Sequence, residues 1–460
     1  MKKFLIFQKK YPKFIYKSYS LNLKPPKLSF EFFYSIPQDF SFVSKFEIQN
    51  LPRKSFDREI LEDLVFHLGL VEMLNYWKAT FSKEIEIEAR KLDQREIKFF
   101  KTLIFKGMGE YFFQNRIPLS FAKKIKIKYQ SGSEKAKKVK LFPKNAILPI
   151  GGGKDSIVLA ELLKDAKMKL FGFTLNPQKN QLLTLNTLPL TKKIIIKREI
   201  DPGLLKLNQA GFLNGHVPFS ALLAFLSLIL AYIFEAKYIA FGFERSADDP
   251  NLKYQGVFIN HQWSKSFEFE RLFFVFSRKF LLKDIYPFSF LRPLFEIQIG
   301  KLFALFPKYH HIFLSCNKPF KINPKVQTWC KTCPKCLFTF VILYPFLGKE
   351  VFDIFGENLF EKKELLGLAK SFLDPRVPKP FECLGTKKEI HSAFFLAQKR
   401  WNEESSNKKL PYLLNYFKNN FFLGEKQEER MSKKLLFSLG KSNIPSKFLS
   451  YLAKKLCLRS

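Results

Sequence analysis

The segment Ala146–Leu163, AILPIGGGKDSIVLAELL, combines residue types that bind a chain of phosphates. Its first apolar run predicts a strand, and the apolar residues at helical spacing near its end predict a helix. Glycines between a strand and a helix let backbone N–H groups approach an anion, and the positive end of the helix dipole faces the same anion. An adjacent lysine and hydroxyl favour a di- or triphosphate; the alternative is a tight turn without a ligand. The candidate phosphate-binding residues are Gly151, Gly152, Gly153, Lys154, Asp155 and Ser156.

The spacing of this loop differs from two common nucleotide-binding patterns, G-x-x-x-x-G-K-[ST] and G-x-G-x-x-G. It resembles the PP-loop of the ATP pyrophosphatase superfamily, which usually reads SGGxDS, with Gly151 where that superfamily often has serine. The resemblance implies an enzyme that cleaves ATP to AMP and pyrophosphate while it adenylates a substrate.

Four cysteines have the spacing of a metal site. Cys330, Cys333 and Cys336 form the string CKTCPKC, and Cys316 precedes them in SCN. Four thiolates at this spacing predict a closed tetrahedral zinc site; an iron–sulfur cluster and unligated thiols are the alternatives. The other two cysteines, Cys383 and Cys457, are expected to be ordinary buried residues.

Two histidines and a lysine are candidates for a catalytic site. His216 precedes a long apolar helix, where capping of that helix is the competing role. His261 and Lys265 lie in INHQWSKSFEFE, a stretch that mixes His, Gln, Trp and Ser with charges just after a predicted strand. A solvated surface needs fewer residue types, so this stretch favours a site.

Two arginines are candidates for binding an anion. Arg245 stands in ERSA, just after a predicted strand, and Arg292 lies in the apolar segment FSFLRPLFE. A guanidinium in apolar surroundings requires a carboxylate or phosphate partner, so Arg292 binds either the substrate or, internally, Glu296.

Alternating strands and helices must position these residues. The alternation from about residue 146 to 346 predicts an α/β fold with a doubly wound parallel sheet, in which ligands bind at the carboxyl ends of the strands. The resemblance of the glycine loop implies that this sheet is of the PP-loop ATP pyrophosphatase type. We expect an N-terminal α/β domain over residues 1–130, a nucleotide-binding domain with the four-cysteine site over residues 145–346, and a helical region over residues 347–460.

Composition limits the partners. The chain has 460 residues, a net charge of +37 and 47% hydrophobic residues, enough for two or three globular domains. Its lysines are spread along the chain, and both Lys and Phe have A/T-rich codons, so codon bias explains the charge. We therefore expect no nucleic-acid partner, and the charge alone does not choose between substrates, because it would also attract a phosphorylated, acidic small molecule.

The segment Val217–Phe234 lacks charges and has about the minimum length of a membrane span. Pro218 suits a first helical turn, and a strand-like YIAFGF follows, as in a buried helix of an α/β core. We therefore expect no transmembrane span. The N-terminal apolar run is too short for a signal peptide, and metal-bound or free cysteines indicate a reducing cytoplasm.

Eight strings, in one order from about His67 to Thr386, together resemble one enzyme family. They are HLGLVEMLNYWKAT, PIGGGKDS, GHVPFSALLAF, ERSA, INHQWSKSFEFE, FSFLRPLFE, TWCKTCPKCLF and PFECLGT. The family is that of the UDP-N-acetyl-α-D-muramoyl-L-alanyl-L-glutamate epimerases of bacterial peptidoglycan synthesis. Phe243, before ERSA, stands where a polar residue is expected.

The resemblance implies an ATP- and Mg²⁺-dependent inversion of the terminal L-glutamate of a UDP-muramoyl dipeptide, with AMP and pyrophosphate released. In that reaction Lys154 would offset pyrophosphate charge, and Asp155 would help to place magnesium. Arg245 or Arg292 would bind an anionic part of the substrate. The proton-transfer pair is expected to be His261 with Lys265 or His216; a different pairing would use the thiol of Cys383.

Two other functions stay open. One is another PP-loop enzyme, such as a ligase or a nucleobase-modifying enzyme similar to 7-cyano-7-deazaguanine synthase, which also joins such a loop to a four-cysteine zinc site. The other is a non-catalytic RNA-binding protein that uses the +37 charge, although no recognisable RNA-binding module is present.

Overall fold

The computed structural model describes residues 2–132, 136–320, 326–405 and 409–457. One ten-stranded sheet, in the order β12-β9-β6-β7-β8-β3-β2-β1-β4-β5, organises the first two thirds of the chain. A second, two-stranded sheet is the hairpin β10 (Leu252–Tyr254) and β11 (Val257–Ile259). The strands of the large sheet are β1 (Lys13–Lys24), β2 (Lys27–Ile36), β3 (Phe40–Ile48), β4 (Glu84–Leu92), β5 (Lys126–Ser131), β6 (Phe142–Pro149), β7 (Lys169–Leu175), β8 (Lys192–Glu199), β9 (Ala236–Phe241) and β12 (Tyr286–Ser289).

The half of the sheet that contains the glycine loop is parallel. Strands β12, β9, β6, β7 and β8 pair in parallel with their neighbours. Residues alternate along β6: Ile147 packs into one hydrophobic core, while Ala146 and Leu148 pack into a second core on the other face. Both faces are therefore covered, which confirms the predicted doubly wound sheet.

The N-terminal strands continue this same sheet. Strand β3 pairs antiparallel with β8, with Phe46 opposite Arg198, and the meander β1–β3 leads on to β4 and β5, which run parallel to β1. The first expected domain ends at residue 130 and the second begins at residue 145. The ten-stranded sheet contains strands from both, so it continues across this predicted boundary. The edge strand β5 lies where the first expected domain ends.

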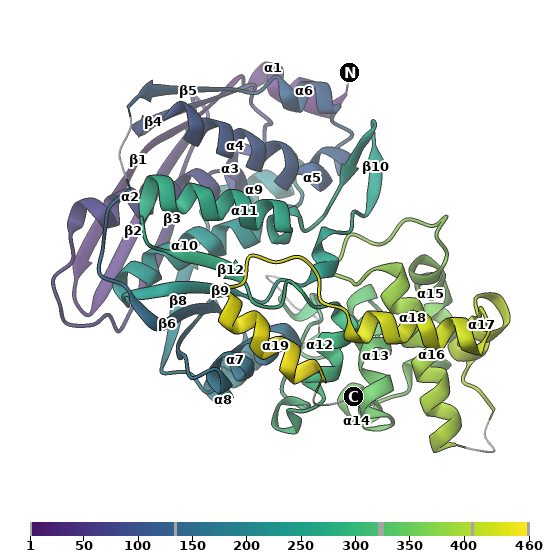
Figure 1. Cartoon of the computed structure of the whole chain (residues 1–460). Helices are drawn as coiled ribbons and strands as arrows, with labels where there is room; N and C mark the ends of the chain where they lie inside the picture. The colour runs from purple at the N-terminus through teal and green to yellow at the C-terminus, as the bar shows by residue number, and fades with distance from the viewer. Residues whose placement is uncertain (1, 133–135, 321–325, 406–408, 458–460) are drawn as a thin grey trace.

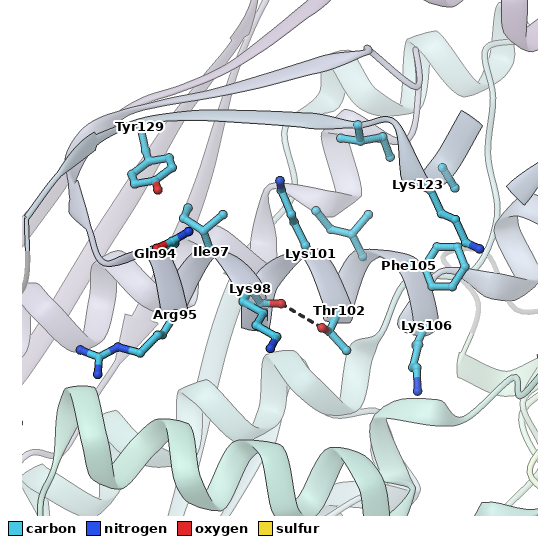
Figure 2. A pocket seen from close by; sticks show the side chains of 13 residues that line it. Gln94, Arg95, Ile97, Lys98, Lys101, Thr102, Phe105, Lys106, Lys123 and Tyr129 are labelled. Carbon is cyan, nitrogen blue, oxygen red and sulfur yellow. Dashed lines mark hydrogen bonds between the residues drawn. The ribbon is translucent and has the colours of Figure 1, made fainter. Parts of the chain in front are cut away.

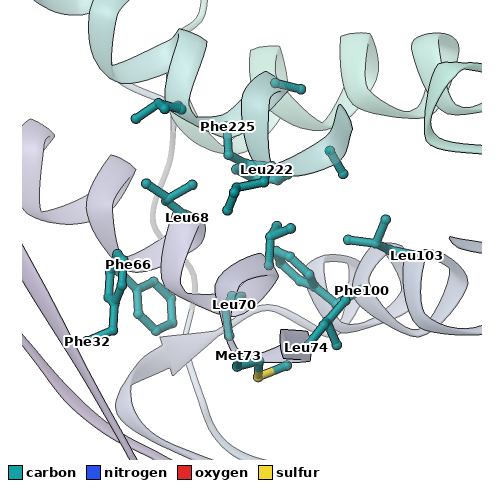
Figure 3. Packing of buried hydrophobic residues seen from close by; sticks show 14 of the residues in the cluster. Phe32, Phe66, Leu68, Leu70, Met73, Leu74, Phe100, Leu103, Leu222 and Phe225 are labelled. Atoms are coloured by element: carbon teal, nitrogen blue, oxygen red, sulfur yellow. The ribbon is translucent and has the colours of Figure 1, made fainter. Parts of the chain in front are cut away.

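Helices around α10 (Phe219–Ile233) form the core on one face of the sheet. Figure 3 shows Leu222 and Phe225 of α10 close to Leu68 of α2 and to Phe100 and Leu103 of α4. Truncating a buried phenylalanine such as Phe225 to alanine would cost about 3–5 kcal/mol. The other helices before the cysteine cluster are α1 (Lys3–Lys10), α2 (Arg58–Glu72), α3 (Leu74–Trp77), α4 (Gln94–Gly107), α5 (Gly109–Gln114), α6 (Leu119–Lys123), α7 (Lys154–Asp165), α8 (Lys179–Thr187), α9 (Pro202–Gln209), α11 (Phe267–Phe276) and α12 (Glu296–Phe303).

The long apolar segment is a buried helix, as predicted. Helix α10 buries nearly all of its residues and packs against α2 and β9. Within the described ranges, no helix combines the length and apolarity that a membrane crossing requires.

The C-terminal region is helical, as predicted, and lies at the lower right of Figure 1. Its last helix returns to the sheet domain, where Lys455 pairs with Asp165 of α7 at 2.9 Å. Helix α16 packs on α13, and both belong to the second core. The helices are α13 (Pro334–Leu347), α14 (Glu350–Phe355), α15 (Leu366–Leu373), α16 (Lys387–Glu404), α17 (Tyr412–Asn420), α18 (Glu425–Phe437) and α19 (Ser446–Cys457).

Candidate active site

The glycine loop connects β6 to α7, as its sequence predicts. Gly152 has a φ of +81°, a left-handed conformation that favours glycine. The amide of Leu314 donates to the carbonyl oxygen of Gly152 at 3.0 Å, and a Cβ on Gly153 would lie 2.8 Å from Ser315 Oγ. A Cβ on Gly151 would meet no atom within 4 Å, so no steric constraint requires glycine at this position.

The loop opens on a cavity of about 560 Å³ at the carboxyl ends of β6, β7 and β9. This is the place where a parallel α/β sheet binds ligands. Phe243 also lines the cavity and stacks on Phe241 with ring centroids 4.9 Å apart. The polar and charged side chains on the wall are Asp155, Ser156, Thr174, Asn176, Gln178, Gln181, Arg198, Ser220, Lys265, Ser315, Asn317, Lys335 and Cys383.

Lys154 follows Gly153 at the start of α7 but is not among the residues that line the cavity. Its side chain is buried, and its ammonium donates to the carboxylates of Asp155 and Glu296. Burial lowers the pKa of Lys154, but the two carboxylates outweigh burial and raise it, so the side chain is charged. The lysines on the cavity wall are Lys265 and Lys335.

Three carboxylates meet beside the loop. Asp155, Glu244 and Glu296 each place an oxygen within 4.8 Å of the others, and the two glutamates are buried. Burial raises the pKa of Glu296 to about 7 and also raises the pKa of Glu244. Within the part of the chain that the structure describes, Glu244 Oε1 has no hydrogen-bond partner. Crowded carboxylate oxygens with an unsatisfied member fit the ligands that Mg²⁺ prefers.

Sequence reasoning found only Asp155 of this carboxylate trio. Glu296 was expected only as an internal partner of Arg292, and Glu244 was not singled out. Both stand in strings that carry the family resemblance, ERSA and FSFLRPLFE, which is the signal that could have identified them.

A thiol cluster lies on the same cavity wall. Lys265 Nζ donates to Cys383 Sγ at 3.2 Å, and His261 also forms a side-chain hydrogen bond with Cys383. His261 Nδ1 contacts the buried carboxylate of Glu110. Cys383 is therefore part of the candidate site and not an ordinary core cysteine; the side chain of Cys457, given the same expectation, lies outside the described residues.

The electrostatics of this cluster favour an ionised thiol next to protonated neighbours. Burial alone would raise the pKa of the Cys383 thiol, but the charge of Lys265 and the hydrogen bond from His261 outweigh burial and lower it to about 5. Burial lowers the pKa of His261, yet hydrogen bonds with Cys383 and Glu110 raise it to about 9. At neutral pH the cluster thus holds a thiolate beside two cations.

His216 lies beside this cluster in a different protonation state. Its ring centroid is 4.4 Å from that of His261, and its Nδ1 is 3.8 Å from Glu110. Burial and the charge of His261 lower the pKa of His216 to about 3, so its imidazole is neutral. The competing capping role is wrong, because α10 has Pro218 as its N-cap and no side-chain cap.

Arg292 is committed to internal partners. It is 1% exposed, its Nε donates to Glu270 at 3.0 Å, and it also donates to the carbonyl oxygens of Glu244 and Lys265. The prediction that Glu296 is the internal partner of Arg292 is wrong, because Glu296 binds Lys154 instead.

Arg245, the other predicted arginine, is not among the residues that line the cavity either. Its guanidinium lies over Phe295, 4.3 Å from the ring centroid. The arginine that lines the cavity is Arg198 of β8. Its guanidinium binds both carboxylate oxygens of the buried Glu72 at 2.8 Å. Sequence reasoning missed Arg198, because no local pattern marks it within β8.

The four predicted metal-binding cysteines come together. Their Sγ atoms all lie within 4.8 Å of one another, with Cys316–Cys333 at 3.8 Å, Cys330–Cys336 at 3.7 Å and Cys333–Cys336 at 3.5 Å. A tetrahedral zinc with Zn–S bonds of about 2.3 Å would separate its sulfurs by about 3.8 Å. The cluster therefore fits a structural zinc ion.

A larger groove, of about 720 Å³, lies away from the loop, along α4 and β5. Figure 2 shows Lys98, Lys101 and Lys106 along α4, with Lys123 and Tyr129 nearby. The described residues that line this groove include no carboxylate, histidine or cysteine. The described lining of the groove therefore lacks the carboxylate, histidine and thiol ligands that metals prefer, whereas the smaller cavity combines carboxylate, lysine and thiol groups with the glycine loop and is the candidate active site.

Comparisons with known proteins identify the family of this chain. The profile of the MurL N-terminal domain matches residues 6–290, and that of the MurL C-terminal domain matches residues 312–416. Proteins named UDP-N-acetyl-alpha-D-muramoyl-L-alanyl-L-glutamate epimerase from Micromonospora sp. and Salinispora tropica are 31% and 30% identical, each over 85% of this chain and over 88% and 86% of their own lengths. The protein of that name from Xanthomonas oryzae pv. oryzae is 31% identical over 74% of this chain and 75% of its own length. Because both profiles and these relatives span most of the sequence, the chain belongs to the MurL family.

Proposed function

We propose that this protein is an ATP-dependent epimerase of peptidoglycan synthesis. It would invert the terminal L-glutamate of UDP-N-acetylmuramoyl-L-alanyl-L-glutamate through an acyl-adenylate and release AMP and pyrophosphate. The observation that carries the proposal is the shared cavity: the glycine loop, the carboxylate trio and the thiol–lysine pair all face or adjoin one space of about 560 Å³. The names of the three relatives supply the substrate.

Adenylation explains why a phosphate loop belongs in an epimerase. The α-proton of a free carboxylate is a very weak acid, because its removal places a second negative charge beside the first. An acyl-adenylate is neutral at the carbonyl and can hold the resulting charge as an enolate. Spending ATP therefore makes the α-carbon reactive, and hydrolysis of the adenylate frees the inverted product.

The chain supplies cations for the phosphates and for the substrate. Backbone N–H groups of Gly151–Ser156 would bind the phosphates at the start of α7, with Lys265 and Lys335 on the wall beside them. Arg198, held by Glu72, would bind an anionic group of the substrate. Arg292 would act by holding the backbone of Lys265.

Two metal ions complete the proposal. Asp155, Glu244 and Glu296 would hold Mg²⁺, which when bound neutralises charge on the phosphates of ATP. The cysteine cluster would hold Zn²⁺, which crosslinks the segment around Cys330 to the chain at Cys316. Metal analysis of the purified, reduced protein should find about one zinc per chain, and none in a Cys333→Ser variant; zinc-free wild-type protein would refute this part.

Chiral analysis of glutamate tests the function directly. The purified protein is incubated with the UDP-muramoyl dipeptide and Mg²⁺, with and without ATP, and the product is hydrolysed. We expect D-glutamate and AMP only when ATP is present, and neither with an Asp155→Asn variant. Inversion without nucleotide would refute the adenylation mechanism, and pyrophosphate release that depends on a purine-like acid would favour a nucleobase-modifying enzyme instead.

A further inference from the structure

We propose that Cys383 Sγ accepts the α-proton of the substrate's terminal glutamate, with Lys265 and the pair His261–Glu110 as the groups that hold the thiol in place. The inference rests on the proposed function, and it names the atom that performs the proton transfer on one face of the α-carbon.

The position of Cys383 brings its thiol to the nucleotide cavity. Cys383 lies between α15 and α16, yet it lines the same cavity as Asp155 and Ser156 of the loop. Lys335 donates to its backbone carbonyl oxygen, and Lys265 donates to its sulfur at 3.2 Å. Because two lysines from distant parts of the chain fix this residue, the thiol and the loop can act on one bound molecule.

The groups around the thiol are themselves fixed. Arg292, 1% exposed, donates to the carbonyl oxygen of Lys265 and to Glu270. Glu110, 6% exposed, contacts His261 Nδ1, which orients the imidazole toward Cys383. A nucleophile or base bonded to a histidine that a carboxylate orients is the arrangement by which proteins keep a thiolate ready to react.

The neighbouring groups are poor proton acceptors. Lys265 is an ammonium, and the raised pKa of His261, about 9, keeps its imidazole protonated at neutral pH. Asp155 contacts Lys154 and belongs to the carboxylate trio proposed to hold Mg²⁺. The thiolate is therefore the basic group on this wall with an available lone pair, and the pKa of about 5 keeps it ionised at neutral pH.

The proton transfer balances without another reactant. The Cα–H bond breaks, an S–H bond forms on Cys383, and the electron pair moves into the enolate of the acyl-adenylate. A proton that comes from water is added to the opposite face and gives the inverted centre, and the thiol later loses its own proton to water. Each turnover therefore replaces the α-hydrogen with hydrogen from solvent.

Two readouts separate proton transfer from adenylation. In D₂O with ATP, Mg²⁺ and the UDP-muramoyl dipeptide, mass spectrometry measures entry of α-deuterium, while exchange of labelled pyrophosphate into ATP measures adenylation. For Cys383→Ala and Cys383→Ser we expect deuterium entry to fall about 10²- to 10⁴-fold. Pyrophosphate exchange should stay within about threefold of the wild-type rate. Ser371→Ala, in α15 away from the cavity, is the matched control and should change neither readout.

The outcomes are distinct. Deuterium entry at the wild-type rate in Cys383→Ala would overturn the inference while leaving the proposed function standing. Wild-type protein with no pyrophosphate exchange would instead refute the proposed function. A covalent substrate adduct on Cys383, seen by intact mass, would also overturn the inference, because the thiol would then be a nucleophile toward the carbonyl.

A measurement on the wild-type chain covers the case in which the variants do not fold. Iodoacetamide at pH 6 reacts slowly with ordinary thiols, whose pKa is about 8.5, and faster with a thiolate. Peptide mapping should find Cys383 modified first, with at least about tenfold protection by ATP and substrate together. A Cys383 that stays unmodified at pH 6 would overturn the inference.

Discussion

Two histidines, His67 and His261, have similar partners in different surroundings. His67 is 3% exposed; its Nε2 lies 2.7 Å from Glu96, and its Nδ1 lies 2.7 Å from the carbonyl oxygen of Asp63 and 3.3 Å from the Asp63 carboxylate. Burial lowers its pKa, but the two carboxylates outweigh burial and raise it to about 10. His261 also binds a carboxylate and also has a raised pKa.

The difference lies in what adjoins each ring. Aromatic residues enclose His67, with ring centroids of Phe66, Phe100 and Phe276 within 6.4 Å, and His67 lines neither the cavity nor the larger groove. His261 instead bonds to a thiol that lines the cavity. A perturbed pKa therefore identifies a functional histidine only together with access to a ligand.

Removing His67 should have the larger effect on stability. His67→Ala leaves the carboxylates of Asp63 and Glu96 without their shared partner in the core, and breaking a buried ion pair in this way costs about 3–5 kcal/mol. Urea unfolding measures the loss. His311→Ala, at an exposed histidine, should stay within about 0.5 kcal/mol of wild type. If His67→Ala were as stable as this control, the structural role assigned to His67 would be wrong.

Removing His261 should affect proton transfer more than stability. In His261→Ala the Cys383 thiolate loses one of the groups that lower its pKa, while Lys265 remains. We expect deuterium entry at pH 6 to fall about 10²-fold, and the acidic limb of its pH profile, near pH 5 in wild type, to move to higher pH. A loss of rate without movement of that limb would mean that His261 contributes only packing.

The groups around His67 and those around His261 also predict different dependence on pH. At His67 the quantity that depends on pH is the unfolding free energy. Because its folded-state pKa is raised, its contribution to stability is full below the unfolded value of about 6.5 and is lost as pH rises through about 10. Within that window the folded state binds one more proton than the unfolded state, which lowers the unfolding free energy by about 1.4 kcal/mol per pH unit. Urea unfolding from pH 6.5 to 9.5 should show this slope as the difference between wild type and His67→Gln. Parallel curves would exclude a titrating His67.

Local patterns allowed much of the fold to be predicted. Alternation and helical periodicity predicted the strand before Gly151, the buried helix that begins after Pro218 and the helical C-terminal region, because each pattern reflects which face of one element is buried. Cysteine spacing likewise predicted the four-thiol cluster.

Contacts between distant segments could not be predicted in this way. Glu110 meets His261 across 151 positions, Cys383 meets Lys265 across 118, and β3 joins β8 to make one sheet. Tertiary packing determines these contacts. The periodicity of one segment does not indicate which distant segment it will contact. The cavity wall was therefore less predictable than the loop that opens on it.

The smallest effect is expected at His216, the neutral neighbour of His261. Its pKa of about 3 makes it a weak base at neutral pH, and its Nδ1 lies 3.8 Å from Glu110, beyond hydrogen-bond distance. His216→Asn should therefore keep deuterium entry within about tenfold of wild type and leave the acidic limb in place, whereas His261→Ala moves it. His216 and His261 lie beside each other and both lie near Glu110, but the hydrogen bond to the Cys383 thiol belongs to His261. The difference in deuterium entry between the two variants therefore measures the effect of that hydrogen bond. A loss of about 10²-fold or more in His216→Asn would show that His216 itself takes part in proton transfer and would contradict its assignment as a neutral neighbour.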